Sequence, residues 1–157
     1  GLPLSVVGGT RDVMDAGKDD GGYFVSSTFA GDRSALEASR VVMMELSSKR
    51  ILDIILEQGG HFIEKFNALF PEIVRIEGYP TRGVFKGSEL DIALFFQESI
   101  RAGILFGPSW FFCFAHIDFI DQVISTCQDI LLRIKNNQVT LQGEMPVKPF
   151  AQKVREL

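Results

Sequence analysis

The chain has 157 residues, of which 46% are hydrophobic and 23% are charged, so it is long enough and apolar enough to form a globular domain with a core. Its net charge of −4 gives no general attraction to nucleic acid, and we expect no nucleic-acid partner. Its two cysteines are too few for a disulfide framework and favour a reducing, cytoplasmic setting.

The first half of the chain predicts a strand and then helices. The apolar run at residues 3–7 predicts a buried strand, and a short helix, TRDVMDA, follows Thr10. Asp32 is placed to cap a helix that reaches about residue 46, where two serines interrupt the apolar stripe. A second helix is predicted over residues 49–69. It contains the pair Gly59-Gly60, which predicts close packing or a kink.

The second half alternates between strands and helices. Residues 73–87 predict two short strands, and Ser88 with Asp91 forms a capping-box-like start for a helix that Gly103 ends. GILFG and WFFCFA predict two more strands, after which Asp118 is expected to cap a last amphipathic helix. This order predicts an α+β fold, in which helices pack on one face of a small antiparallel sheet.

Histidines and cysteines offer little chemistry. His61 and His116 are far apart in sequence, and neither has another ligand at metal-binding spacing, so we expect no metal site. His61 is expected on a helix surface and His116 at the end of a strand. Cys113, in an apolar strand, and Cys127, on an apolar helix face, are expected to be buried and unreactive.

An aromatic run, Phe106, Trp110, Phe111, Phe112 and Phe114, has two interpretations. We prefer a core strand with a second face covered by another domain; the alternative is that the aromatics line a pocket. The surrounding stretch, GILFGPSWFFCFA, is interrupted by a Gly-Pro pair and is too short to span a bilayer, so we expect no membrane segment.

The stretch SSTFAGD places three hydroxyl residues, Ser26, Ser27 and Thr28, just before the helix that Asp32 caps. The simpler interpretation is that Asp32 caps the helix and the hydroxyls satisfy nearby backbone groups. A phosphate site is the other interpretation, because a helix N-terminus favours an anion. These residues by themselves favour the simpler interpretation.

Three segments read together carry a more specific signal. GLPLSVVGGTRDVM, SSTFAGDRSALEASRVVMMEL and ALFFQESIRAGILFGPSWFFCFAHIDFIDQVIS resemble, in that order, the C-terminal third of class III pyridoxal-phosphate-dependent aminotransferases. The likeness is greatest to the glutamate-1-semialdehyde aminotransferase branch and extends to about residue 136. Arg33 stands where many members of the family have proline. This feature is similar to the subgroup that acts on sugars, so a sugar or another carbonyl compound is the expected substrate.

The resemblance implies several functional features. The family's threonine in the segment that SSTF resembles contacts the phosphate of pyridoxal 5'-phosphate in the neighbouring subunit of a homodimer. Thr28 takes that role here, with Ser27 as a helper. The family's Schiff-base lysine and the aspartate that pairs with the pyridine nitrogen both precede the segment that GLPLSVVGG resembles. We therefore expect no catalytic residue in this chain.

The chain does not begin with Met, and we expect a C-terminal fragment that is inactive by itself. Residues 1–30 would be the remnant of the large cofactor-binding domain, residues 31–136 the small domain and residues 137–157 a polar tail or linker. The alternative is a non-catalytic module that binds a partner protein through its aromatic face. A lysine encoded shortly before Gly1 would favour the enzyme, and a start codon there would favour the module.

Overall fold

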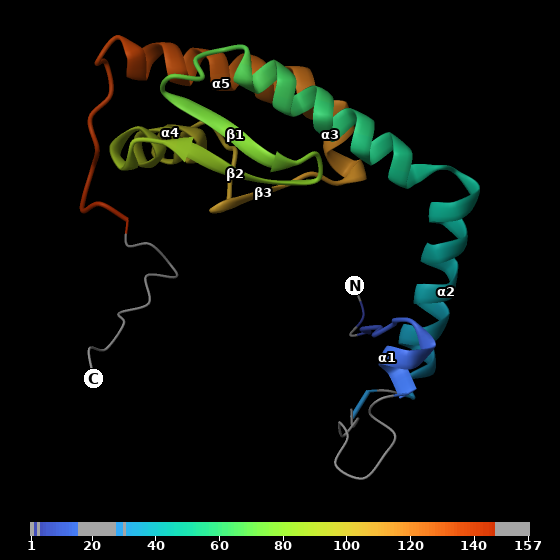
Figure 1. Cartoon of the computed structure of the whole chain (residues 1–157). Coiled ribbons are helices and arrows are strands. Elements are labelled where there is room, and N and C mark those ends of the chain that lie inside the picture. Colours follow the sequence, from blue (N-terminus) through green and yellow to red (C-terminus); the bar gives the residue numbers. More distant parts are fainter. Residues whose placement is uncertain (1, 3, 16–27, 30, 147–157) are drawn as a thin grey trace, which may run out of the picture. The chain divides into compact units, whose positions relative to one another are not determined.

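The computed structural model describes residues 2, 4–15, 28, 29 and 31–146 (Figure 1). The chain divides into two compact units, Gly1–Ile51 and Leu52–Leu157. The predicted domain boundaries at residues 30 and 136 remain predictions.

The first unit contains helices α1 (Arg11–Asp15) and α2 (Arg33–Ser48). Asp32 caps α2 as predicted, because its carboxylate accepts a hydrogen bond from the backbone N–H of Ser34 at 3.0 Å. Only one residue of α2, Ala35, is buried. The helix ends two residues later than predicted, and Arg50, with a φ of 49°, separates it from the next helix.

The prediction of a buried strand over residues 3–7 is wrong for residues 4–7, which the structure describes. Pro3 lies outside the described residues, residues 4–7 have no strand structure, and Val6 and Val7 are 86% and 84% exposed. An apolar run becomes a strand only when another strand is present to accept and donate its backbone hydrogen bonds. None of the described residues pairs with it.

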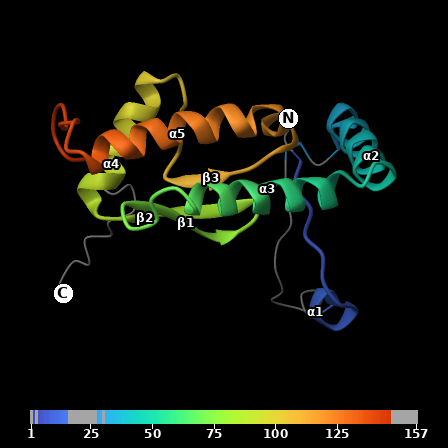
Figure 2. The same cartoon turned by 90° about the horizontal axis from the view of Figure 1, so that it is seen from above.

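The second unit is the expected α+β structure. Its sheet has the order β1 (Val74–Tyr79), β2 (Arg82–Gly87) and β3 (Ser109–Phe111), with both pairs antiparallel. Helices α3 (Ile51–Asn67) and α5 (Ile120–Lys135) lie side by side along the sheet in both views (Figures 1 and 2). Helix α4 (Glu89–Arg101) packs against α5 and the β1–β2 hairpin.

The core lies where these helices meet the sheet. The ring of Phe66 on α3 is fully buried, and its centroid lies 5.9 Å from that of Phe85 on β2 and 5.6 Å from that of Phe95 on α4. Asn67 connects the end of α3 to β1 through two hydrogen bonds. Its side-chain amide donates to the carbonyl of Ile76 at 2.9 Å and accepts from the backbone N–H of Ile76 at 2.8 Å. Two hydrogen bonds from one side chain thus continue the backbone pairing of the sheet.

Of the two neighbouring glycines in α3, only Gly59 lies where a larger side chain would not fit. A Cβ at Gly59 would lie 2.2 Å from the carbonyl oxygen of Pro80 in the β1–β2 turn, whereas a Cβ at Gly60 would meet nothing within 4 Å. The prediction of close packing is therefore confirmed at Gly59. Glycine there lets the helix approach the hairpin.

Two predictions about residues 103–119 are wrong, and a third is confirmed only in part. GILFG forms no strand: Gly103, with a φ of 83°, ends α4, and the segment then runs irregularly. The last strand pairs only over Ser109–Phe111, and the chain then enters the 3-10 helix η1 (Phe114–Phe119). Asp118 lies within η1, so it does not cap α5. The N-cap residue is Phe119, which makes no side-chain capping bond.

The segment after α5 is held more firmly than its polar composition indicates. The side chain of Gln97 donates to the carbonyl of Thr140 at 3.1 Å and accepts from the N–H of Gln142 at 2.7 Å. Val139 and Leu141 pack against the core. In residues 139–142, hydrogen bonds at two positions alternate with core contacts at the other two, so this part of the expected tail is held against the second unit.

Candidate functional site

Thr28 lies in a turn just before α2, and its side chain is exposed. Just after Thr28, the N–H of Asp32 donates to the carbonyl of Phe29 at 3.1 Å. Ser26 and Ser27 lie outside the described residues. An exposed threonine hydroxyl fits the role of donating to a phosphate that approaches from outside the chain.

The N-terminus of α2 is less suited to an anion than the sequence indicates. The Asp32 carboxylate already occupies it and takes up the N–H of Ser34. Because this carboxylate is itself negative, a second anion at the same helix end would be repelled. A phosphate near this turn would therefore depend on Thr28 and not on the helix dipole.

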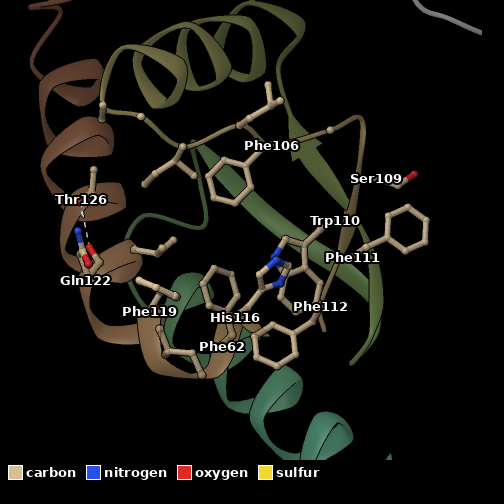
Figure 3. A pocket seen from close by; sticks show the side chains of 17 residues that line it. Phe62, Phe106, Ser109, Trp110, Phe111, Phe112, His116, Phe119, Gln122 and Thr126 are labelled. Atoms are coloured by element: carbon tan, nitrogen blue, oxygen red, sulfur yellow. Dashed lines mark hydrogen bonds between the residues drawn. The ribbon is translucent and has the colours of Figure 1, made fainter. Parts of the chain in front are cut away.

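A cavity in the second unit is the other candidate site. It has a volume of about 580 Å³ and is lined by 17 residues from α3, the segment after α4, β3, η1 and α5 (Figure 3). Aromatic and aliphatic side chains dominate its wall, among them Phe62, Phe106, Trp110, Phe112, Phe119 and Val123. The volume lies within the range of about 300–1,000 Å³ that is typical of small-molecule pockets.

The aromatic run therefore contributes both to the core and to the cavity wall, the two roles that its sequence predicted. Trp110 and Phe112 are 5% and 6% exposed and belong to the core, as the preferred interpretation predicts. The same two side chains also line the cavity, together with Phe111, which is 59% exposed. The coverage of this face by another domain remains a prediction.

His116 is one of the polar groups of the cavity wall, together with Ser109, Gln122 and Thr126. It lies in η1 and not at the end of a strand, because β3 stops at Phe111. Its Nδ1 accepts the backbone N–H of Cys113 at 3.2 Å, and its ring meets that of Phe112 edge-on at 5.7 Å. With Nδ1 acting as acceptor, the neutral imidazole carries its proton on Nε2 and can donate one hydrogen bond from there.

The two cysteines differ in environment. Cys127 is buried on α5 as predicted, and burial raises the pKa of its thiol to about 12, which leaves it unreactive at neutral pH. The expectation of a buried Cys113 is wrong. It is exposed at the N-cap of η1, because the strand that was expected to bury it ends at Phe111.

The described residues contain no group of three or more His, Cys, Asp or Glu side chains that could hold a metal ion. His61 is exposed on α3, as predicted. No helix within the described part of the chain is both long enough and apolar enough to cross a membrane.

The described lysines are not arranged for covalent catalysis. Lys49 pairs with Glu45, Lys65 with Asp121 at 2.7 Å, and Lys135 with Glu72 at 3.1 Å. A Schiff-base lysine needs its amine available to attack a carbonyl carbon, whereas these three amines are paired with carboxylates. Lys86 is exposed, and none of the described lysines lines the cavity.

Several cavity residues escaped the sequence analysis. Phe119, Val123 and Thr126 all line the cavity from the α5 side. Their spacing of four and three residues places them on one helix face, which is the signal that could have grouped them. Phe62 comes from α3, and only the tertiary fold brings it there.

No family model matches the chain. Two curated relatives do, and both carry the name glutamate-1-semialdehyde 2,1-aminomutase. The protein from Aquifex aeolicus is 24% identical over 151 residues, which covers 82% of this chain and 36% of the relative. The protein from Methanocorpusculum labreanum is 26% identical over 126 residues, which covers 71% of this chain and 30% of the relative. The chain thus spans about a third of the length of these relatives, and it is similar to enzymes of the aminomutase class.

Proposed function

We propose that this chain is the C-terminal part of a pyridoxal-phosphate-dependent aminotransferase or aminomutase of class III. The observation that carries the proposal is that two proteins with the same enzyme name match 82% and 71% of the chain. The α+β fold of the second unit is consistent with a small C-terminal domain. Pyridoxal 5'-phosphate, when bound, supplies the electron sink for amino transfer.

The role proposed for this chain is to hold the cofactor phosphate of a neighbouring subunit in a homodimer. Thr28 would donate its hydroxyl to the phosphate, and Ser27 would assist. The exposure of Thr28 and its place in the turn before α2 support this role. A hydroxyl-to-phosphate bond is charge-assisted and contributes about 1.5–3 kcal/mol.

The substrates follow from the same resemblance. An amino donor and a carbonyl compound, either a sugar or a smaller aldehyde, would exchange an amino group in the cytoplasm. The described lysines of this chain are exposed or paired with carboxylates. By the family resemblance, the lysine that holds the cofactor would belong to a segment before Gly1, and the 157-residue chain would be inactive by itself.

Substitution of Thr28 in the complete enzyme tests the proposal. Thr28→Val keeps the shape and β-branching but removes the hydroxyl, so cofactor affinity should fall about tenfold to a hundredfold. Thr28→Ser retains the hydroxyl and should restore most of the affinity. Removal of the cofactor should also loosen the dimer, because coupling between the two sites is reciprocal. Titration of the cofactor into the apo-enzymes measures the affinity.

Equal affinities for wild type and Thr28→Val, combined with a lower melting temperature, would mean that Thr28 only satisfies local backbone groups. The phosphate role would then be wrong.

The second candidate is a protein-interaction module. Three phenylalanines at one end of the second unit favour it: Phe111, Phe114 and Phe119 are 59%, 52% and 55% exposed. The coding sequence before Gly1 separates the candidates. A lysine shortly before Gly1 and an aspartate-bearing strand further back support the enzyme, whereas a start codon near Gly1 supports the module.

A further inference from the structure

We propose that the cavity of the second unit binds an uncharged molecule that contains an aromatic ring. The cavity measures about 580 Å³, and all of its lining residues belong to the second unit. The inference is independent of the proposed enzyme function.

The aromatic wall of the cavity is already held in place by the core. Trp110 stacks on Phe62 with ring centroids 5.0 Å apart and an interplanar angle of 18°, and it contacts Phe112 at 5.5 Å. Phe62, Trp110 and Phe112 are 3%, 5% and 6% exposed. Because core packing fixes these rings, the back of the cavity is preformed, and binding should cost little ordering entropy. The three rings expose little surface themselves, so a ligand ring would contact chiefly Phe111 and Phe119, which also line the cavity and are 59% and 55% exposed.

The charge of the lining decides the chemical class of the ligand. None of the lining residues is an Asp, Glu, Lys or Arg. A carboxylate or an ammonium that entered the cavity would lose hydration without gaining an ion pair. An uncharged ligand avoids this cost, so the cavity should discriminate against both signs of charge.

Four polar side chains line the cavity and give the site direction: Ser109, His116, Gln122 and Thr126. His116 has its Nδ1 engaged by the N–H of Cys113, so its neutral form offers Nε2–H as a donor. Thr126 is less available, because its hydroxyl already donates to the carbonyl of Gln122 at 2.9 Å. The expected ligand therefore combines a ring with a hydroxyl, ether or carbonyl oxygen that can accept from His116 or from the side-chain amide of Gln122.

The chain carries its own reporter for this site, since Trp110 is its one tryptophan and lies in the cavity wall. Phenylpropanol, phenylpropionate and phenylpropylamine share a ring and a three-carbon linker but differ in charge. Titration of each into the 157-residue chain should change Trp110 fluorescence saturably for phenylpropanol, with a Kd of about 1 mM or below. The two charged analogues should bind at least about tenfold more weakly.

Two matched variants locate the binding. Thr126→Phe fills part of the cavity and should weaken phenylpropanol binding at least about tenfold, because the ring occupies ligand volume. Ser125→Phe places the same ring on the adjacent residue of α5, which is exposed and does not line the cavity, and should leave affinity within about twofold. If Thr126→Phe fails to fold, amide NMR shifts of the wild-type chain serve instead. On addition of phenylpropanol, the signals of Gly103, Ser109 and Thr126 should move, and that of Glu72 should not.

The proposal is overturned if phenylpropanol gives no saturable signal, if a charged analogue binds as tightly, or if the two phenylalanine variants behave alike. It is also overturned if the complete protein does not bind phenylpropanol, since the cavity would then be filled by the protein itself. Absence of aminotransferase activity in the complete protein would refute the proposed function and leave this titration unaffected.

Discussion

Helices α2 and α5 have the same length of 16 residues and similar amphipathic sequences, yet they lie in very different surroundings. On α5 the apolar residues Ile120, Cys127, Ile130, Leu131 and Ile134 are buried. On α2 only Ala35 is buried, while Leu36, Val41, Val42, Met43 and Met44 are 46–59% exposed. An amphipathic pattern thus predicts a helix, but it does not say whether the apolar face is covered. The second unit has a core of its own, and the described part of the first unit has almost none.

The largest expected effect comes from removing the ring at the centre of the second unit. Phe66→Ala should destabilise that unit by about 3–5 kcal/mol, because Phe66 is fully buried and contacts the rings of Phe62, Phe85 and Phe95. The matched change on α2, Met43→Ala, removes a side chain that is 59% exposed and should cost less than about 0.5 kcal/mol. Denaturant unfolding followed by circular dichroism and Trp110 fluorescence measures both. Similar losses in the free energy of unfolding for Phe66→Ala and Met43→Ala would contradict the difference in burial between the two units.

The next effect concerns two ion pairs of the same type and spacing. Glu98 pairs with Arg101 at 2.5 Å and with Arg133 at 3.0 Å, and its side chain is only 3% exposed. On α2, Glu37 pairs with Arg40 at 2.5 Å, but both side chains are more than half exposed. Glu98→Gln should cost about 1.5–3 kcal/mol, because a charge-assisted buried network is lost. Glu37→Gln should leave the free energy of unfolding unchanged within error, since solvent screens exposed pairs.

The same pair predicts a pH dependence. Burial by itself raises the pKa of Glu98, but hydrogen bonds from Gln97 and Arg101 and the charges of Arg101 and Arg133 outweigh it and hold the pKa below its usual value. A lowered folded-state pKa means that the stabilisation is present above the unfolded-state pKa and is lost as the pH falls through the folded-state value. Stability measured from neutral to acidic pH should therefore fall less steeply in Glu98→Gln than in wild type. Parallel curves would show that folding leaves the pKa of Glu98 unchanged, which would contradict the lowered value.

The smallest expected change in stability comes from substituting the neighbouring glycines of α3, Gly59 and Gly60. Gly59→Ala should cost about 1–3 kcal/mol, because the new methyl would lie 2.2 Å from the carbonyl oxygen of Pro80 and would push the helix from the hairpin. Gly60→Ala meets nothing within 4 Å and should stabilise the helix by about 0.5–1 kcal/mol. Opposite signs in thermal unfolding would confirm the close approach at Gly59. Stabilisation by both would contradict it.

The sequence predicted what local pattern controls. The helices, the Asp32 and Ser88 caps, the β1–β2 hairpin and the α+β class are all confirmed. It failed where tertiary partners decide the outcome. Residues 4–7 have the composition of a strand, but none of the described residues pairs with them. The segment after Gly103 forms no strand, although Phe106 packs against Phe85 of β2.

The same limit applies to the candidate sites. The phosphate role of Thr28 came from resemblance, because one exposed hydroxyl in a turn carries little information by itself. The cavity could be anticipated only in part. Its α5 residues share a helical face, but Phe62 and Trp110 meet only after α3 has packed onto the sheet.

The most direct measurement for the central claim is to locate the cofactor on the complete protein. Borohydride reduction fixes pyridoxal 5'-phosphate to the lysine that holds it, and mass spectrometry of the digest then identifies that residue. We predict a modified lysine in the segment before Gly1 and none among the lysines of this chain. Modification of a lysine within this chain, or a complete protein that binds no pyridoxal 5'-phosphate, would contradict the account.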